Sequence, residues 1–520
     1  MNPSSRTPLG GLAALAIALP WLNPFAPGPS PPVLQWLVTF ACAAVLLILL
    51  ALRCLDARAW ARACALGWLL AALISSLLGL LQYLGATAAF SPWVNSTELG
   101  EAFANLRQRN QFATLTNMGL AALLWWEAQA PATGKAGGAT TGARQFSLLL
   151  MTALLALGNA ASSSRTGMVQ LLLLASLLVL WRHFAKTPGS AEARHLRWRL
   201  LLLALAVYAL ALLALPRLAG LDPVSHGLLA RLAEGDSACG SRITLWGNVL
   251  HLIAQKPWLG WGWGELSYAH YITLFPGLRF CEILDNAHNL PLQLAVELGV
   301  PAAVLLCVGS LWLSFKAHPW REHDPARRMA WAVLAVILLH SMLEYPLWYG
   351  PFLMAAILCL VLLRPPSADV AFRATVGRHA VVPLAAAGAA SLLALVAYTA
   401  WDYQRASQIF LRPADRDPAY QDDTLAKIQG SWLFSRHVDY AELTTTDVTR
   451  SNAAHMHLLA LRLVHFSPEG RVIEKLIESA VQLGLDEEAL AHMQRFRAAF
   501  PGQYARWEQR GTAAEAAPTE

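Results

Sequence analysis

The sequence predicts an all-α polytopic membrane protein with about eleven transmembrane helices, a long outer loop and a C-terminal helical domain. Two observations carry this prediction. First, 56% of the 520 residues are hydrophobic and only 14% are charged, whereas a soluble globular protein carries about 25% charged residues. Second, apolar runs long enough to cross a bilayer recur through the first 400 residues.

The expected transmembrane helices are assigned from these apolar runs. The first one follows Arg6 and could be mistaken for a signal peptide, but no small-x-small cleavage site follows it, so we assign it as a span. The spans lie near residues 9–23, 33–52, 63–84, 110–130, 146–162, 166–181, 200–216, 290–315, 329–347, 349–363 and 380–400.

Lys and Arg are distributed unequally between the two sides of these spans. With the N-terminus inside, 18 fall on the inner side and 8 on the outer side of residues 1–400. This asymmetry favours a cytoplasmic N-terminus and an outer C-terminal domain. The net charge of +6 is therefore an inner-face feature and does not indicate nucleic-acid binding.

The polar sequence forms an outer loop and a C-terminal domain. Residues 217–289 are too long for a plain connection and contain helical patterns of their own. Residues 401–520 carry 13 Lys and Arg and 17 Asp and Glu. Turns at "SPEG", "LGLD" and "FPG" divide this domain into helices that resemble tetratricopeptide-type pairs.

Two of the seven cysteines, Cys239 and Cys281, fall in the outer loop. An envelope location is oxidising, so we expect them to form a disulfide. The other five lie in or near the spans or at the inner face, where they are small packing residues.

Polar residues gather where several apolar runs meet the outer face. "NLRQRNQ" opens one span with Gln108, Arg109, Asn110 and Gln111, where the alternative is a plain helix cap with snorkelling arginines. "SSSRTG" places Arg165 in a short turn. Arginine is the preferred reader of phosphate because its planar fork makes paired, charge-assisted bonds, but a headgroup arginine explains this residue equally well.

Two more motifs lie in the outer loop. Arg242 begins an amphipathic helix that continues to Trp246. "LGWGWG", residues 259–264, is interpreted as a turn with interfacial tryptophans, because no strand precedes its alternating glycines.

"AHNLP" places His288 and Asn289 before a helix whose first turn holds Pro291. A helix N-terminus attracts anions, and a histidine can accept a proton near neutral pH. The alternative is an interfacial histidine that caps the helix.

The last motif, "HSMLEYPLWYGP", places His340, Glu344 and Tyr345 within apolar sequence. Ionisable residues at membrane depth are functional candidates. No Asp-x-Asp pair occurs in the outer loops, so neither a metal ion nor another cofactor is expected.

Taken together, these motifs resemble the O-antigen ligase superfamily. The shared elements are Arg165 in a Ser-Arg turn, the helix from Arg242 to Trp246 with its Gly-Trp-Gly turn, and Ala287-His288-Asn289. "NLRQRNQFA" and "HSMLEYPLWYGPFL" further resemble the bacterial protein O-oligosaccharyltransferases of the pilin-glycosylase type. That family more often has proline where Arg109 stands, which leaves the role of Arg109 open.

The resemblance implies a glycosyltransferase that moves a glycan from undecaprenyl pyrophosphate to a Ser or Thr hydroxyl of a periplasmic protein such as pilin. Arg165 and Arg242 would bind the pyrophosphate, and His288 would take the proton of the hydroxyl. The side chains expected to orient the sugar or the acceptor are Gln108, Arg109, Asn110, Gln111, Asn289, Glu344 and Tyr345.

Three other functions remain open. An O-antigen ligase acting on lipid A core and an O-antigen polymerase use the same donor chemistry. A polyprenyl-glycan transporter predicts internal repeats and polar residues at mid-membrane, whereas these polar residues cluster at the outer face.

Overall fold

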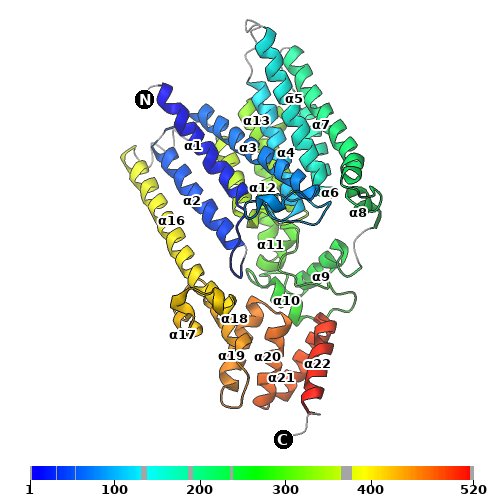
Figure 1. The fold of residues 1–520 in the computed structure, drawn as a ribbon, viewed down its shortest axis with the longest axis vertical. Coiled ribbons are helices and arrows are strands. Elements are labelled where there is room, and N and C mark those ends of the chain that lie inside the picture. Colours follow the sequence, from blue (N-terminus) through cyan, green and yellow to red (C-terminus); the bar gives the residue numbers. More distant parts are fainter. Residues whose placement is uncertain are drawn as a thin grey trace. The chain divides into compact units, whose positions relative to one another are not determined.

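The computed structural model describes residues 3–30, 32–52, 54–129, 138–184, 191–234, 238–364 and 378–515 (Figure 1). The regular structure in these ranges is entirely helical, as the sequence predicts. The chain divides into two compact units, which are described separately below. The first unit comprises Met1–Gly235 and Leu313–Tyr398, and the second comprises Asp236–Trp312 and Thr399–Glu520.

Most helices of the first unit are long and pack around one hydrophobic core. The helices of this unit are α1 (Pro3–Leu22), α2 (Pro32–Ala51), α3 (Ala57–Tyr83), α4 (Arg109–Ala128), α5 (Gly138–Ala161), α6 (Arg165–His183), α7 (Ala191–Leu218), the short α8 (Leu228–Glu234), α13 (Pro325–Ser341), α14 (Gly350–Leu362) and most of α16 (Arg378–Ser407), whose described side chains lie outside that core. Short 3-10 turns lie at Ala88–Phe90, Pro319–Arg321 and Pro346–Trp348.

Small residues let these helices approach closely. A Cβ on Gly119 of α4 would lie 2.4 Å from the Ala72 Cβ of α3, and one on Gly158 of α5 would lie 2.4 Å from the Ser76 Oγ of α3. Close approach at small residues is a common way of packing membrane helices. Helices α4 and α5 therefore both lie directly against α3.

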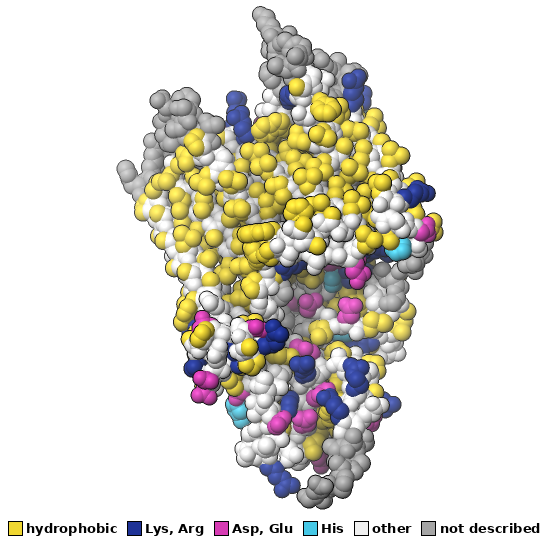
Figure 2. Space-filling model, viewed as in Figure 1, with side chains coloured by type: hydrophobic (Ala, Val, Ile, Leu, Met, Phe, Trp, Pro, Cys, Tyr) yellow, Lys and Arg dark blue, Asp and Glu magenta, His cyan; other side chains and the backbone are white. Residues whose placement is uncertain are grey.

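One outward face of the first unit is largely apolar. On the face drawn in Figure 2, hydrophobic side chains cover the long helices of this unit almost continuously. Such a surface is far larger than the apolar patches of soluble monomers. It is the surface expected of helices that face lipid.

Six helices in the described residues are long and apolar enough to cross a membrane, and they correspond to six of the predicted spans. They are Pro32–Ala51, Ala57–Tyr83, Arg165–His183, Arg197–Leu218, Val300–Arg321 and Val382–Phe410. Pro8–Leu22 and Gly350–Leu362 are shorter apolar helices at two further predicted spans. The chain thus has several membrane-spanning candidates, while the total of about eleven stays a prediction.

Two predicted spans are wrong in their extent. The span predicted at 290–315 is two helices, α11 (Leu290–Leu298) and α12 (Val300–Lys316), broken at Gly299. The span predicted at 329–347 ends as an α-helix at Ser341 and is followed by the 3-10 turn at Pro346–Trp348. In the second case Pro346 has no amide hydrogen with which to continue an α-helix.

The second unit combines the outer loop from residue 238 onward with the C-terminal helices. Its helices are α9 (Arg242–Gln255), α10 (Leu266–Ile272), α11, most of α12, α17 (Thr424–Ile428), α18 (Ser435–Thr445), α19 (Ala453–Phe466), α20 (Gly470–Gln482), α21 (Asp486–Ala499) and α22 (Pro501–Glu515). Three 3-10 turns precede α17, at Gln408–Phe410, Pro413–Asp415 and Pro418–Tyr420.

The domain boundary near residue 400 stays a prediction. Residues 238–289 of the predicted outer loop group with the C-terminal helices, whereas residues 217–234 belong to the first unit. The reason is a shared core. Tyr271 of α10 is 1% exposed and is buried in the same hydrophobic cluster as Leu463 of α19 and Phe496 of α21.

Candidate functional site

The loop that precedes α4 is organised by one buried glutamine, Gln82 of α3. Its Nε2 donates to the Asn95 and Ala104 carbonyls, at 2.8 Å each, and its Oε1 accepts from the Ala104 amide at 2.6 Å and the Phe103 amide at 3.0 Å. Gln82 is completely buried. Sequence reasoning missed it, although a lone amide between apolar residues at the end of a span was a usable signal.

Asn105 and Arg107 tie the same loop to the end of α1. Asn105 Nδ2 donates to the carbonyls of Leu22 and Trp93, at 3.0 Å each. Arg107 Nη2 donates to the Pro24 carbonyl at 2.5 Å, and its backbone adopts a left-handed conformation with φ of 60°. The polar residues at the start of "NLRQRNQ" therefore shape the loop.

The next residues start α4. Gln108 is the N-cap, and its Oε1 accepts from the Gln111 amide at 2.6 Å. Arg109 forms an ion pair with Glu101 of the same loop. Gln111 is 2% exposed, and its Oε1 has no hydrogen-bond partner among the described residues. The ion pair gives Arg109 a structural role in the loop.

Asn110 connects three motifs that are distant in sequence. Its Oδ1 accepts from Ser164 Oγ at 2.6 Å, and its Nδ2 donates to Glu344 Oε1 at 3.3 Å. Ser164 is the N-cap of α6, and its Oγ also accepts from the Gly167 amide at 3.0 Å. The "NLRQRNQ", "SSSR" and "LEYP" motifs thus meet at the side chain of Asn110.

Arg165 is the first residue of α6 and is half-buried beside a second arginine. Its Nη2 donates to the Arg231 carbonyl at 2.5 Å, and Arg231 Nη1 donates to the Ser163 carbonyl at 3.0 Å. Two guanidinium groups and a helix N-terminus therefore lie together, an arrangement that favours anions. Arg231 was not singled out from the sequence, because nothing local marks it as a neighbour of Arg165.

Behind Asn110, a buried polar network joins α4, α6 and α13. Thr114 Oγ1 lies 2.9 Å from His340 Nδ1, and Gln170 Nε2 donates to Thr114 Oγ1 at 2.9 Å. Gln170 Nε2 also donates to the Val336 carbonyl at 3.0 Å, and its Oε1 accepts from Asn117 Nδ2 at 3.2 Å. One atom of this network, His340 Nε2, has no hydrogen-bond partner among the described residues. Hydrogen bonds within a buried network rigidify the helices that carry it. His340 therefore supports the helices around Glu344.

Glu344 and Tyr345 follow the end of α13. The Glu344 amide donates to the His340 carbonyl at 2.8 Å. The Tyr345 and Tyr349 rings stack with centroids 5.7 Å apart. Glu344 and Tyr345 are both half-buried.

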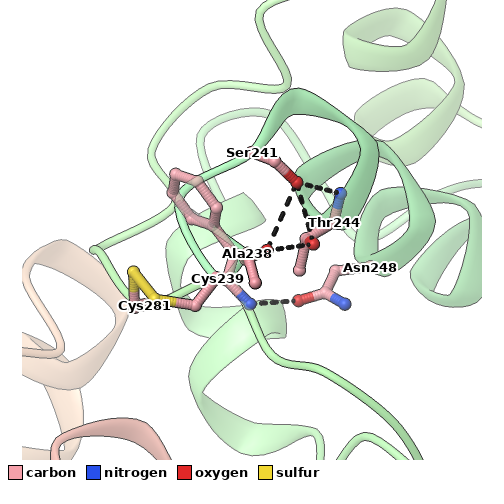
Figure 3. Close-up of a disulfide and its surroundings, with 7 residues drawn as sticks. Ala238, Cys239, Ser241, Thr244, Asn248 and Cys281 are labelled. Atoms are coloured by element: carbon pink, nitrogen blue, oxygen red, sulfur yellow. Dashed lines mark hydrogen bonds between the residues drawn. A yellow bond between two sulfur atoms is a disulfide. The ribbon is translucent and has the colours of Figure 1, made fainter. Parts of the chain in front are cut away.

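In the second unit, Arg242 begins α9, and Ser241 is its N-cap. Ser241 Oγ accepts from the Thr244 amide at 3.2 Å, and Thr244 Oγ1 donates to the Ala238 carbonyl at 2.6 Å (Figure 3). A side-chain oxygen that satisfies an amide of the first turn fixes where a helix begins. The N-terminus of α9, and with it Arg242, is therefore defined by local capping.

The helix of Arg242 is hydrogen-bonded to the turn that carries His288. Trp246 Nε1 donates to the Ala287 carbonyl at 3.0 Å. The Ala287 amide in turn donates to Gln293 Oε1 at 2.6 Å. The Arg-x-x-x-Trp motif and the Ala-His-Asn motif therefore form one hydrogen-bonded cluster.

His288 lies immediately before α11, whose N-cap is Asn289 with Pro291 in the first turn, as the sequence predicts. Asn289 Oδ1 accepts from the Leu292 amide at 3.1 Å, and the His288 amide donates to Asn286 Oδ1 at 2.9 Å. His288 has φ of 50°. A left-handed conformation is uncommon for a residue other than glycine and persists only where the surrounding structure holds it.

The Gly-Trp-Gly turn packs backbone to backbone against the break between α11 and α12. The Trp261 amide donates to the Val296 carbonyl at 2.8 Å, and the Gly262 amide donates to the Glu297 carbonyl at 3.0 Å. A Cβ on Gly299 would lie 2.1 Å from the Trp258 carbonyl oxygen, and Gly299 has φ of 88°. The interpretation of residues 259–264 as a plain turn was incomplete, because the glycines allow this close approach.

Glu297 is an acid buried beneath the same turn, with 3% exposure. Its Oε1 accepts from the Gly264 amide at 2.8 Å, and its Oε2 has no partner among the described residues. Glu297 therefore binds the glycine turn.

Cys239 and Cys281 are joined by a disulfide, with Cα atoms 5.3 Å apart (Figure 3). Next to it, Asn248 Oδ1 accepts from the Phe280 amide at 2.8 Å and contacts His270 Nε2 at 3.2 Å. Burial, reinforced by Arg279, lowers the pKa of His270 to about 3. His270 is therefore a neutral ring in the core of the loop.

The second unit also joins α10 to the C-terminal helices. Tyr271 Oη lies 2.8 Å from His492 Nδ1, and the Tyr268 ring stacks on the His465 ring with centroids 3.7 Å apart. Glu265 forms an ion pair with His465 at 2.7 Å. The residues next to the glycine turn thus contact both α19 and α21.

Three or more His, Cys, Asp or Glu side chains do not gather into a metal-binding group anywhere in the described ranges. The cations that the described motifs supply are guanidinium groups. Arg165 and Arg231 lie in the first unit, and Arg242 lies in the second.

Three segments match known family models. Residues 102–126 match the protein glycosylation ligase model, residues 150–307 the O-antigen ligase model, and residues 328–514 the C-terminal model of the virulence factor membrane-bound polymerases. The first two models cover the segments that hold Asn110, Arg165, Arg242 and His288.

Two relatives come from Acinetobacter baylyi. A general O-oligosaccharyltransferase is 26% identical over 307 residues, which are 57% of this chain and 50% of that protein. A ComP-specific O-oligosaccharyltransferase is 25% identical over 259 residues, which are 50% of this chain and 43% of that protein. The chain thus spans about half the length of the curated relatives it matches, and the resemblance that its motifs indicate is confirmed.

Proposed function

We propose that this chain, a relative of the O-antigen ligase superfamily and of its protein O-oligosaccharyltransferases, is a glycosyltransferase. In this proposal it transfers a glycan from undecaprenyl pyrophosphate to Ser or Thr hydroxyls of periplasmic proteins such as pilin. One hydrogen bond gives the main support for the proposed mechanism. The bond from Trp246 to the Ala287 carbonyl couples the helix that begins with Arg242 to the turn that carries His288.

Arg165 and Arg242 are proposed to bind the pyrophosphate. Each is the first residue of a helix capped by a serine, and so stands at the positive end of a helix dipole, where anions are favoured. A guanidinium group stabilises the charge that develops as lipid pyrophosphate departs. These cations make a metal ion unnecessary for that role.

His288 is proposed to accept the proton of the acceptor hydroxyl. The hydroxyl oxygen attacks the anomeric carbon, the bond from that carbon to the phosphate oxygen breaks, and undecaprenyl pyrophosphate leaves with the electron pair. The proton passes to the imidazole of His288. A general base of this kind contributes about 10² to 10⁴ in rate.

The remaining polar residues are proposed to orient the sugar and the acceptor. Asn110 and Glu344 are hydrogen-bonded to each other, and Tyr345 follows Glu344 directly. The same role is proposed for Gln108, Arg109, Gln111 and Asn289. For Arg109 this is a role through the loop, since its guanidinium group is paired with Glu101.

The proposed location is the bacterial inner membrane, with a cytoplasmic N-terminus and with the active site and the C-terminal domain in the periplasm. The positive-inside distribution of Lys and Arg supports this orientation. The disulfide between Cys239 and Cys281 fits an oxidising compartment.

A second candidate is a polymerase or a ligase acting on lipid A core. The match of residues 328–514 to the C-terminal polymerase model favours it, because that segment includes Glu344 and the helical domain. The match of residues 102–126 to the protein glycosylation ligase model and the two O-oligosaccharyltransferase relatives favour a protein acceptor.

The test is transfer in vitro with the purified full chain and a glycan carried on undecaprenyl pyrophosphate. Pilin and lipid A core are supplied in parallel, and labelled glycan is expected on the protein. His288→Ala and Arg242→Ala are each expected to lower the rate at least about a hundredfold. The controls are His455→Ala and Arg217→Ala, which remove exposed side chains of the same types.

Glycan found only on lipid A core would exclude a protein acceptor and would support the second candidate, a ligase acting on lipid A core. Full activity of both His288→Ala and Arg242→Ala would exclude the mechanism.

A further inference from the structure

The first unit contains a cavity of about 180 Å³ at the end of the loop that precedes α4. Four parts of the chain line it. They are the segment after α1, the start of α2, the loop residues up to Gln108, and Tyr349 just before α14. No role for this cavity follows from the motifs alone, because its walls come from both ends of the unit.

Four carboxamides contribute to the walls, from Asn23, Gln35, Asn105 and Gln108. Asn23 is held rigidly, because its side chain both donates to the Phe25 carbonyl at 3.1 Å and accepts from the Phe25 amide at 3.2 Å. The Gln35 side chain and Gln108 Nε2 make no hydrogen bond to any other residue that the structure describes. A carboxamide carries both donors and an acceptor, which suits a ligand rich in hydroxyl groups.

Two aromatic rings also line the cavity, from Phe25 and Tyr349. Phe25 packs edge-on against Trp93 with centroids 5.4 Å apart, and Tyr349 stacks on Tyr345. Rings fixed by a neighbouring ring present a flat apolar surface of low mobility. Polar groups at set positions beside such a surface are typical of small-molecule sites.

Arg107 supplies the charge of the cavity. Its guanidinium group donates to the Pro24 carbonyl at 2.5 Å and to Asn95 Oδ1 at 3.4 Å. None of the residues that line the cavity is Asp or Glu. The lining thus suits a neutral or weakly anionic polar ligand better than a cation or a lipid tail.

We propose that this cavity binds a sugar ring of the donor glycan. The inference rests on the proposed function, and it deepens that function by assigning a sugar site to Gln35, Tyr349 and Asn23. Gln108 links this site to the phosphate-binding groups along the chain. It caps α4 two residues before Asn110, whose side chain is bonded to Ser164 next to Arg165.

The inference is tested on the purified full chain with two measurements. In the transfer assay, Gln35→Leu and Tyr349→Ala are expected to raise the KM for the glycan donor by about tenfold each, the value of one lost hydrogen bond or ring contact. Turnover at saturating donor should fall less than the KM rises. Gln145→Leu, on α5 and outside the cavity, is the matched control and should leave both parameters unchanged.

The second measurement is independent of activity. A thiol placed in the cavity by Asn23→Cys is labelled with a maleimide, with the unsubstituted chain as the background for the native cysteines. The glycan-bearing donor should slow labelling at least about fivefold, and undecaprenyl pyrophosphate without sugar should not.

The outcomes separate the inference from the proposed function. Unchanged donor KM in both variants, or equal protection by the lipid that lacks a sugar, would overturn the sugar site while transfer by the unsubstituted chain still supported the reaction. Protection by the glycan donor in a chain that transfers nothing would support the sugar site and overturn the reaction.

Discussion

Asn110 Oδ1 accepts a hydrogen bond from Ser164 Oγ at 2.6 Å. The bond joins the start of α4 to the N-cap of α6, across 54 positions of the sequence. The other end of the Asn110 side chain donates to Glu344. One carboxamide therefore sets the positions of the residue before Arg165 and of the acid before Tyr345.

We predict that Asn110→Ala lowers transfer by about tenfold or more, with a loss of about 1–2 kcal/mol in stability, because two partners lose their bonds. Asn110→Asp should lower transfer further, since it replaces the donor to Glu344 by a second acceptor group. Transfer rate and thermal unfolding measure the two effects. Ser147→Ala, which removes an exposed hydrogen bond within α5, is the control. Wild-type rates in both Asn110 variants would contradict the proposed role of this junction.

Gly299 allows the break between α11 and α12. Gly309, inside α12, provides the control for its substitution. Gly299→Ala should destabilise the chain by at least about 2 kcal/mol, because a Cβ there would lie 2.1 Å from the Trp258 carbonyl oxygen. A Cβ on Gly309 would have no neighbour within 4 Å. Gly309→Ala should therefore be neutral or stabilise the helix by up to about 1 kcal/mol.

Thermal unfolding of the purified chain distinguishes the two glycine variants. Equal melting temperatures for Gly299→Ala and Gly309→Ala would show that the backbone contact at the glycine turn does not require glycine.

The disulfide closes a loop between residues 42 positions apart. Removing it with Cys239→Ser and Cys281→Ser together should cost about 4 kcal/mol, through the restored freedom of the unfolded loop. Cys307→Ser, at a half-buried free cysteine of the same unit, should change stability far less. Peptide mapping without reductant should recover Cys239 and Cys281 in one linked pair, and free thiols at both would contradict the bond.

The second unit should lose stability in mild acid. Burial lowers the pKa of His270 to about 3 and that of His492 to about 4, and nearby arginines reinforce both shifts. The unfolded histidines titrate near pH 6.5, so protons bind preferentially to the unfolded state below that pH. Stability is complete above pH 6.5 and decreases as the pH falls toward the folded pKa values.

By pH 5 the loss should be about 2 kcal/mol for His270, visible as a lower melting temperature of the purified chain. His492→Gln should weaken the dependence on pH, because it removes one of the two buried imidazoles. A melting temperature equal at pH 7 and pH 5 would be inconsistent with neutral, buried imidazoles at these positions.

The sequence by itself determined the class of the protein and several details of its helices. Apolar length and composition predicted the long helices of the first unit, because burial in lipid depends mainly on hydrophobicity along one segment. The chain around Asn289 and Pro291 predicted the start of α11, because a helix cap is an interaction within about four residues. The motifs around Arg165, Arg242 and His288 were recognisable because each is a short continuous stretch of sequence at the start of a helix.

Only the tertiary structure decided how these motifs are connected. Gln82 organises the loop before α4, Arg231 contacts the turn of Arg165, and Asn110 bonds to Ser164, all between residues far apart in sequence. Hydrophobic patterning specifies which face of a helix is buried, but it does not specify which polar group will lie opposite. The glycine at position 299 illustrates this limit, because a Cβ there would meet the backbone of Trp258, which the local sequence of the helix does not contain.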